Sequence, residues 1–244
     1  MRRHRILGIA SLLPLLAITA IIIIPGRSQE QKPRIKTHGR KFDENRFPIA
    51  DYTASDPSDP KERLKRQEKG KKYDKSAWRI YPETTSNMAR VDYVDPNLPA
   101  LPLTESSAVI VGQITDAKAY LSNDKTGVYS SFTVQVNEVL KNSSTVPLST
   151  ASSIEVERDG GRVRFPGGRI LIYTINSQDM PVVGLRYVLF LTNPHGQSDF
   201  EILTAYELRE GKVYPLDDLP NLYRYENADE LNFLSELRNR IANP

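Results

Sequence analysis

The chain has 244 residues, a formal net charge of +3 and no cysteine, which excludes a disulfide framework and a cysteine-based metal site. Its hydrophobic content of 39% is low for this length and predicts one globular domain together with much unpacked chain. Residues 1–100 hold 20 Lys and Arg against 12 Asp and Glu, whereas residues 101–244 hold 13 against 18. The basic character therefore belongs to the N-terminal part, and we expect no nucleic acid partner for the acidic remainder.

Residues 1–28 are predicted to direct the chain to a membrane. Residues 2–5 (Arg-Arg-His-Arg) precede an apolar run over residues 6–24, an order typical of a signal sequence. The 19 residues of this run make a helix of about 28 Å, close to the roughly 30 Å hydrocarbon core, and so permit a membrane anchor. Gly26 and Ser28 also place small residues where a signal peptide is cleaved. Both an uncleaved anchor and a cleaved signal stay open.

Basic residues flank both ends of the apolar run, and positive charge favours the cytoplasmic side of a membrane. The charge count alone does not decide the orientation. Because the short basic N-terminus is typical of exported proteins, we expect export to the cell envelope, either membrane-anchored or as a periplasmic or secreted protein. A membrane-tethered domain that faces the cytoplasm is the alternative.

Residues 29–103 are predicted to form a polar, basic and largely disordered tether. Prolines recur among charged residues, and the apolar residues show no period, so this segment cannot bury enough surface to offset its ordering entropy. Residues 61–72 can form a short charged helix, but Leu64 is its only apolar residue and nothing is expected to fix it to a core. Its basic charge can attract anionic lipid or a cell-wall polymer.

Residues 104–244 have the pattern of a mainly β domain. Residues 108–114 are rich in β-branched side chains, and residues 128–140 alternate Phe132, Val134 and Val136 with polar residues, which predicts a long hairpin. Further short runs follow at residues 154–158, 162–165, 169–175, 185–191, 200–203, 206–208 and 213–214. Their spacing and glycine-containing turns predict a small OB-like Greek-key barrel or a sandwich.

One helix is predicted at the C-terminal end, over residues 227–242. Asn227 or Asp229 can cap its N-terminus. Phe233 lies off the apolar stripe, which comprises Leu231, Leu234, Leu237 and Ile241. We expect this stripe to dock on the β domain, and binding of a partner protein is the alternative.

Three stretches of the β domain resemble a known family. They are residues 108–116 (AVIVGQITD), 132–141 (FTVQVNEVLK) and 184–191 (GLRYVLFL). In this order they resemble bacterial OB-type barrels, which are similar to netrin-like and metalloproteinase-inhibitor domains, over roughly residues 105–195. The resemblance implies the fold alone. The inhibitor branch contacts the protease zinc through an N-terminal cysteine, which this chain lacks.

Few residues are suited to catalysis or metal binding. No two of His4, His38 and His195 have the spacing of metal ligands, and His195 is interpreted as a turn residue. Ser122-x-x-Lys125 and the Lys-Thr-Gly that begins at Lys125 match two motifs of penicillin-recognising enzymes, but there the motifs supply different lysines on different elements. We interpret this match as chance. The sequence therefore names no catalytic, cofactor-binding or metal-ligating residue.

Carboxylates are plentiful, but none is obviously paired for catalysis. Glu155 and Glu157 share one face of an expected strand, and their expected role is a solvated strand surface. Acid–base catalysis would require two carboxylates in different environments. Asp217 and Asp218 are adjacent, and a weak calcium site there is an alternative without a calcium-loop signature.

Arginines around two glycine-rich turns form the candidate patch for an anion or a partner. The four are Arg158, Arg162, Arg164 and Arg169. Forked guanidinium groups can hold a phosphate, an acidic glycan or a partner carboxylate. The alternative, which we favour, is that they pair across the hairpin with the preceding acidic residues, namely Glu155, Glu157 and Asp159.

Together these features favour a non-enzymatic, envelope-directed binding or assembly module with no predicted cofactor. Its predicted partners are the membrane, through residues 6–24 if these are uncleaved, and an envelope protein or an anionic polymer. The main alternative is a hydrolase that uses carboxylates of the β domain. A cleft that holds two or more buried carboxylates would favour that alternative.

Overall fold

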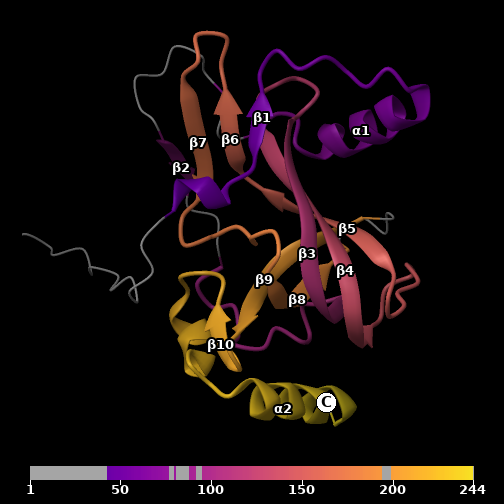
Figure 1. The fold of residues 1–244 in the computed structure, drawn as a ribbon, viewed down its shortest axis with the longest axis vertical. Coiled ribbons are helices and arrows are strands. Elements are labelled where there is room, and N and C mark those ends of the chain that lie inside the picture. The colour runs from indigo at the N-terminus through magenta and orange to yellow at the C-terminus, as the bar shows by residue number, and fades with distance from the viewer. Residues whose placement is uncertain (1–42, 77–79, 81–87, 92–94, 194–198, 244) are drawn as a thin grey trace, which may run out of the picture. The chain divides into compact units, whose positions relative to one another are not determined.

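The computed structural model describes residues 43–76, 80, 88–91, 95–193 and 199–243. Within these ranges the chain is mainly β and ends in a helix, which confirms the predicted fold class at this level (Figure 1). In chain order the elements are η1 (Glu44–Arg46), β1 (Ile49–Asp51), α1 (Pro60–Lys72), β2 (Met88–Val91), β3 (Ala108–Leu121), β4 (Val128–Asn142), β5 (Ser153–Asp159), β6 (Gly161–Arg164), β7 (Ile170–Ile175), β8 (Arg186–Thr192), β9 (Phe200–Arg209), β10 (Lys212–Pro215), η2 (Pro220–Tyr225) and α2 (Glu230–Ala242).

Five strands pair with one another in a cycle. β3 lies antiparallel to both β4 and β8, β4 pairs antiparallel with β5, and β8 pairs antiparallel with β9. A short parallel pairing of β5 with β9 joins the two ends of this series. Each of the five strands therefore has two partners within the cycle. β10 extends the sheet as a hairpin with β9.

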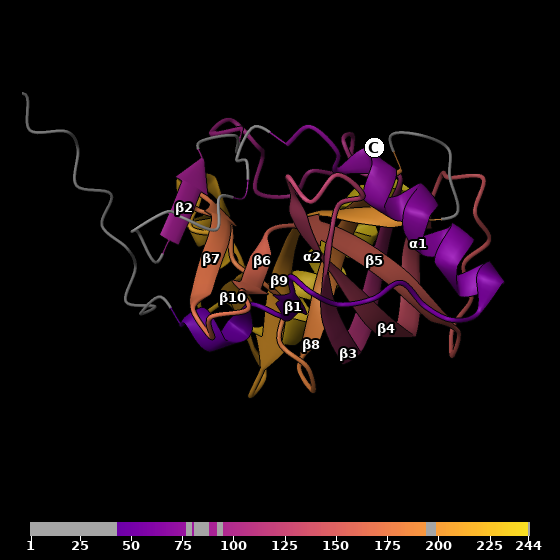
Figure 2. The same ribbon diagram turned by 90° about the horizontal axis from the view of Figure 1, so that it is seen from above.

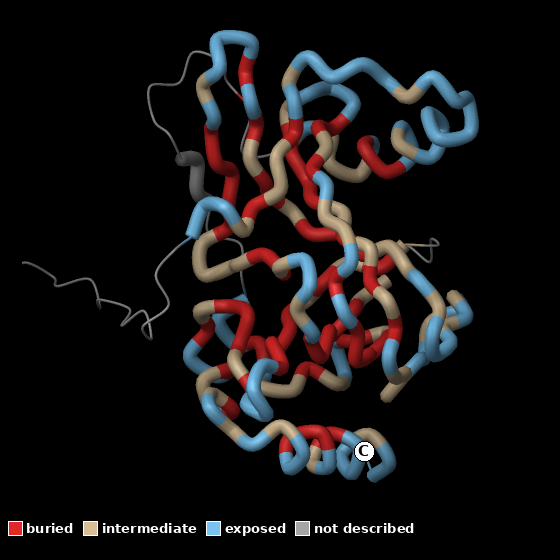
Figure 3. Tube along the Cα trace, in the orientation of Figure 1, coloured by how far each residue is buried: buried red, intermediate tan, exposed pale blue. Residues whose placement is uncertain are grey.

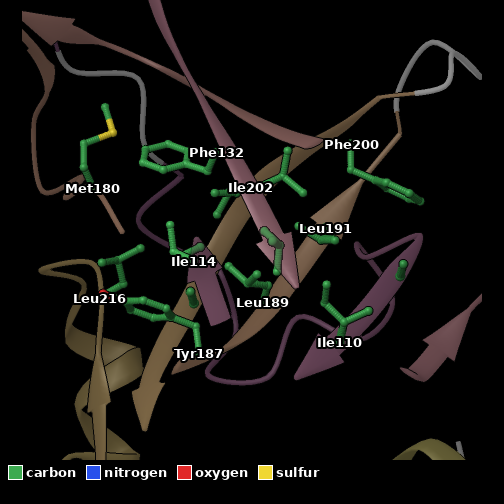
Figure 4. Packing of buried hydrophobic residues seen from close by; sticks show 14 of the residues in the cluster. Ile110, Ile114, Phe132, Met180, Tyr187, Leu189, Leu191, Phe200, Ile202 and Leu216 are labelled. Atoms are coloured by element: carbon green, nitrogen blue, oxygen red, sulfur yellow. The ribbon is translucent and has the colours of Figure 1, made fainter. Parts of the chain in front are cut away.

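The first hydrophobic core gathers the inward side chains of these strands. Along β4, Phe132, Val134 and Val136 are buried and the residues between them are less so, which confirms the predicted alternation. Figure 4 shows their counterparts from β3, β8 and β9, among them Ile110, Ile114, Tyr187, Leu189, Leu191, Phe200 and Ile202. Because each large apolar side chain contributes roughly 1.5–3 kcal/mol on burial, this core is a main source of stability.

A second sheet has the strand order β1-β6-β7-β2. β6 and β7 form an antiparallel hairpin between β5 and β8 in the sequence, while β1 joins β6 and β2 joins β7 in parallel. Val163, Leu171 and Tyr173 of the hairpin bury a smaller apolar cluster together with Ala119 and Leu121 of β3. The long strand β3 therefore contributes to both the first core and this cluster.

Part of the segment predicted to be a tether packs on the β domain. Phe47 is fully buried in the first core, β1 adds to the second sheet, and α1 is held against β5 by ion pairs. The prediction of a largely disordered tether over residues 29–103 therefore does not hold for residues 43–76. One buried aromatic ring, backbone pairing and ion pairs hold this part, and none of these produces an apolar period in the sequence.

The predicted membrane segment at residues 6–24 and the cleavage site after Ser28 lie outside the described residues. Among the residues that the structure describes, no helix is both long and apolar enough to cross a membrane. The assignment of residues 1–28 to a signal peptide or an anchor stays a prediction.

The C-terminal helix α2 docks on a second hydrophobic core, which confirms the predicted docking. Asp229, one of the two predicted caps, accepts a hydrogen bond from a backbone N–H of the first turn. Phe233, Leu234 and Leu237 are buried, whereas Leu231 is 77% exposed. The predicted apolar stripe is therefore wrong at two positions, because the buried face includes Phe233 and excludes Leu231.

Candidate functional site

The outward face of β5 carries three carboxylates. Val156 points into the first core, so strand alternation places Glu155, Glu157 and Asp159 on the opposite face. Glu157 is fully buried, and its partner position on β9 is Glu201. A buried carboxylate requires a cation or hydrogen bonds to compensate for lost hydration, and here α1 supplies them. This face is therefore not the solvated surface predicted from the sequence.

The helix α1 forms because its first turn is capped and its last turn is basic. The Asp59 side chain accepts a 3.0 Å hydrogen bond from a backbone N–H, and Pro60 occupies the first helical position. Only Lys69 and Gly70 are buried, and Leu64 is 60% exposed. Figure 3 shows the helix as largely exposed with one buried turn. It lacks an apolar anchor, as predicted, and charge holds it in place instead.

The ribbon of Figure 2 shows α1 beside β5. The lysines of α1 reach the carboxylates of β5 and that of Asp199, the residue before β9. Lys69 Nζ lies 2.8 Å from Glu155 Oε2, 2.9 Å from Glu157 Oε1 and 3.4 Å from Asp199 Oδ2. Lys72 Nζ lies 3.3 Å from Glu157 Oε2. A third lysine lies 2.9 Å from Glu155, and the helical spacing of the three places them on one face. The lysine–carboxylate cluster thus comprises Lys65, Lys69, Lys72, Glu155, Glu157 and Asp199.

The C-terminal end of α1 is fixed on the turn between β3 and β4. The Tyr73 hydroxyl donates to Glu157 Oε2 at 3.1 Å, and its ring stacks on Tyr129 with 4.2 Å between ring centroids. Asp124 of the turn accepts a 2.8 Å hydrogen bond from the Lys75 backbone N–H. The helix is therefore held by directed polar contacts at its buried turn and just after its last residue.

The pKa values of Lys69 and Glu155 are both shifted in the direction that favours the charged form. Burial alone would lower the pKa of Lys69, but the charges of Glu157 and Glu155 beside it raise that pKa above its usual value. For Glu155, burial acts to raise the pKa, but hydrogen bonds from Lys69 and Lys65 lower it to about 2. Each of these two groups therefore stabilises the charged form of the other.

The pKa of Asp159 is shifted in the opposite direction to that of Glu155 on the same face. Burial, followed by the negative charges of Glu201 and Glu157, raises the pKa of Asp159 to about 6. Asp159 therefore takes up a proton slightly below neutral pH, where Glu155 stays ionised. Two carboxyl groups with separated pKa values are what general acid–base catalysis requires, although Glu157 between them is fully buried against α1.

We predict that Asp159→Asn raises the melting temperature at pH 8 and changes it little at pH 4. An unfolded Asp titrates near pH 3.9. Because the folded pKa is raised to about 6, Asp159 lowers the stability of the native state as the pH rises from about 4 to about 6. Thermal unfolding at both pH values measures the difference, and an equal shift at both would contradict the assignment.

The control for Asp159→Asn is Glu155→Gln, for which the expected sign is reversed. The lowered pKa of Glu155 contributes stability above its unfolded value of 4.5, and this contribution is lost as the pH falls toward 2. Glu155→Gln should therefore lower the melting temperature at pH 7 and have little effect near pH 2. The partial exposure of Glu155 makes this loss the smaller of the two effects.

No protein-family model matches this chain, and a search of curated proteins gives no match. The site is therefore interpreted from its own geometry. Among the described residues, no group of three or more His, Asp or Glu is arranged to hold a metal ion. The carboxylates of the cluster instead face lysines.

The structure separates the four predicted arginines, and Arg158 is a buried group. Its Nη2 lies 2.7 Å from Asp217 Oδ2, and its Nη1 donates to the Asp179 carbonyl at 2.6 Å. Asp217 Oδ2 also accepts from Thr204 Oγ1 at 2.7 Å. Arg158 therefore pairs with none of the three acidic residues favoured from the sequence, and Asp217 is engaged by protein groups rather than presented for calcium.

The other three arginines lie on or next to the β6–β7 hairpin. Arg162 Nε donates to the Phe47 carbonyl at 2.7 Å, which ties β6 to the N-terminal segment. Arg164 is exposed, and the Arg169 guanidinium lies 5.2 Å from the centroid of the Phe165 ring. Arg164 and Arg169 thus lie on either side of the turn that joins β6 to β7. An anion or partner site at this end of the hairpin stays a prediction.

Ser122 and Lys125 belong to the β3–β4 turn. The Ser122 hydroxyl donates to Asp124 Oδ1 at 2.8 Å and accepts from the Gly127 N–H at 2.9 Å. Lys125 Nζ donates to the Tyr52 carbonyl at 3.2 Å. Both side chains serve the turn and its contacts, in keeping with the interpretation of the motif as chance. His195 lies outside the described residues.

A polar pocket of about 370 Å³ lies between this turn, α1 and the segment after β1. Asp51, Asp56, Arg66 and Lys125 contribute charges of both signs to its lining. Arg66 is also engaged at 3.3 Å with the Ser55 carbonyl. The pocket is separate from the carboxylate face of β5, because none of the residues of the cluster lines it.

The sequence did not identify the lysines of α1 as site residues. The available signal was the spacing of two sets of charges. Lysines at positions 65, 69 and 72 share one helix face, and acidic residues occupy alternate positions of one strand. This signal is weak because surface lysines and glutamates are common, and no local pattern indicates that residues 85 positions apart meet.

Proposed function

We propose that the chain is a non-enzymatic, envelope-directed binding or assembly module built on an OB-type barrel. The cycle β3-β4-β5-β9-β8, with four antiparallel pairings and one parallel pairing, supports a five-stranded barrel of this type. The resemblance of residues 105–195 to bacterial OB-type barrels supports the same proposal. The β6–β7 hairpin and α2 are additions to this barrel.

OB-type barrels bind ligands on the face of their second and third strands and on the adjoining loops. In this chain those strands are β4 and β5, and the first adjoining loop is the β3–β4 turn. The observation that carries the proposal is that this face already holds a polypeptide segment. Lys69 and Lys72 of α1 are engaged with Glu157 and Asp199 within 4.0 Å, and Tyr73 covers Tyr129.

The proposed location rests on residues 1–28. A phosphatase reporter that is active only outside the cytoplasm, fused after Pro244, should be active in cells. If instead a reporter that works only in the cytoplasm were active when fused at the same place, export would be overturned. That result would favour the alternative of a cytoplasm-facing interaction domain.

Affinity capture from native membranes tests the binding proposal. The full chain, tagged at its C-terminus and cross-linked in cells, should recover a defined envelope protein or polymer at a reproducible ratio. The matched control is the tagged chain with Glu138→Gln, which removes an exposed charge that pairs with Arg238 of α2 and should leave the recovery unchanged. Recovery that is equal for the folded chain and a denatured control would contradict a binding function.

A carboxylate hydrolase is the second candidate, and Asp159 is the observation that favours it. Its pKa of about 6 beside the buried Glu157 meets the requirement for an acid and a base in different environments. This candidate requires that α1 leaves the face. Turnover of chromogenic glycosides or esters that is lost in Asp159→Asn would support it over the binding module.

A further inference from the structure

The contacts of α1 are almost entirely electrostatic, which sets it apart from the rest of the packed chain. Of its 13 residues only Lys69 and Gly70 are buried, whereas α2, of equal length, buries Phe233, Leu234 and Leu237. Release of α1 therefore exposes little apolar surface apart from the Tyr129 ring, on which Tyr73 stacks. The cost of release is mainly the loss of ion pairs, and it is offset by the hydration that Lys69 and the fully buried Glu157 regain.

The helix is also an internal segment with an open linker before it. Residues 53–56 are exposed, as are residues 58–60 at the start of the helix. β1 is fixed separately by its pairing with β6, and β2 by its pairing with β7. The helix can thus leave the face while the strands on both sides of it in the chain keep their partners.

The vacated face would present a row of charges. Glu155 and Glu157 lie two positions apart on β5, with Asp199 beside them, and the Tyr129 ring lies at the end of the row. The occupant seen in the structure defines what this row recognises: ammonium groups at the i, i+4 and i+7 positions of one helix, followed by an aromatic residue that stacks on Tyr129.

We propose that the carboxylate face of β4 and β5 is the docking surface for a lysine-rich helix of a partner protein, and that α1 is a built-in competitor that occupies it. The inference rests on the proposed binding function and names its ligand class. A tethered segment has an effective concentration on the order of millimolar, so an equivalent helix in solution binds weakly until α1 is weakened or displaced.

The test uses the full chain in detergent and a fluorescent peptide of residues 57–76 as the probe. With Lys69→Gln/Lys72→Gln in the chain, its own helix no longer neutralises the face, and the peptide should bind at least tenfold more tightly than to the wild type by fluorescence anisotropy. A peptide that carries the same two substitutions should not bind. Equal binding of the wild-type peptide to both chains would overturn the proposal.

Two further substitutions in the weakened chain separate recognition from general charge attraction. Glu157→Gln should reduce peptide binding at least tenfold, because it removes the carboxylate that both lysines contact. Glu138→Gln is the matched control. It removes the same charge at another place, because the Glu138 carboxylate pairs with Arg238 of α2. Equal losses for the two substitutions would reduce the interaction to non-specific attraction and contradict the proposal.

A covalent lock keeps the test independent of variants that fail to fold. A Cβ placed on Gly70 would lie 3.2 Å from Cγ of Asn123, so Gly70→Cys/Asn123→Cys sets two cysteines within reach of a disulfide in a chain that has no other. With the two cysteines placed in the Lys69→Gln/Lys72→Gln chain, the oxidised form should not bind the peptide, and reduction should restore the tight binding of that chain. Equal binding by both forms would place the docking surface elsewhere.

The same lock distinguishes failure of this inference from failure of the proposed function. A native partner that is captured by the reduced chain and lost on oxidation supports both. Capture that is equal for the two forms overturns the role of the α1 face and leaves a binding module that uses another surface. Capture by neither form, in cells where the chain is exported, counts against the binding function itself.

Discussion

Asp217→Ala is expected to destabilise the native state by about 3–5 kcal/mol, because it leaves a buried guanidinium without its counter-ion. The side chains of Arg158 and Asp217 are 3% and 2% exposed, and Asp217 also accepts hydrogen bonds from Thr204 and from the Asp179 backbone N–H. For a folded unit of this size such a loss lowers the melting temperature by on the order of 10 °C. Thermal and urea unfolding of the full chain measure it.

Glu138→Gln is the control for this prediction, because its ion pair with Arg238 has similar geometry at the surface. Its N–O distance is 2.8 Å, but the two side chains are 39% and 48% exposed. Exposed pairs contribute about 0–1 kcal/mol, so the melting temperature should change little. If Asp217→Ala lowered the melting temperature no more than Glu138→Gln does, the prediction would be wrong. Such a result would mean that other groups compensate the charge of Arg158 after Asp217 is removed.

A double substitution tests the physical reason for the loss. Replacing both charges with apolar side chains, as in Arg158→Met/Asp217→Leu, removes the need for compensation and should recover much of the stability lost in Asp217→Ala. The double variant also removes one of the four arginines predicted to form an anion patch. If the double variant regained stability, that result would agree with a structural role for Arg158 rather than a role in an anion patch.

The strands of the first core could be predicted because their signal is local. The alternation of Phe132, Val134 and Val136 within β4 is a property of adjacent residues, and the structure buries all three. Arg158 was instead predicted to lie in a charged patch or to pair with neighbouring acidic residues, because its actual partner Asp217 lies 59 positions away. A buried ion pair of that kind leaves no period in either segment.

The site was missed for the same reason, and the tether prediction failed with it. A segment with little apolar content is expected to stay unpacked because it cannot offset its ordering entropy by hydrophobic burial. In this chain Lys69 and Lys72 replace that burial with ion pairs to Glu157, and Phe47 supplies one buried ring. Composition measures hydrophobic burial alone, so it underestimates segments that dock by charge.

Phe233→Ala is expected to destabilise the native state by about 3–5 kcal/mol, because it opens a cavity in the second core. The Phe233 ring lies 5.1 Å from that of Tyr206 and 5.0 Å from that of Tyr225, measured between centroids, and the residue is 2% exposed. These aromatic partners explain why the buried face of α2 includes Phe233. Urea unfolding should show a lower midpoint at an unchanged slope.

Leu231→Ala is the matched control on the same helix. Leu231 is 77% exposed, so its truncation should change the free energy of unfolding by no more than about 0.5 kcal/mol. The pair of variants also decides between the two roles predicted for the helix. If α2 served mainly to bind a partner, Phe233→Ala would leave stability unchanged while Leu231→Ala would reduce partner capture. The contacts of Phe233 favour the opposite result, in which α2 is part of the folded domain.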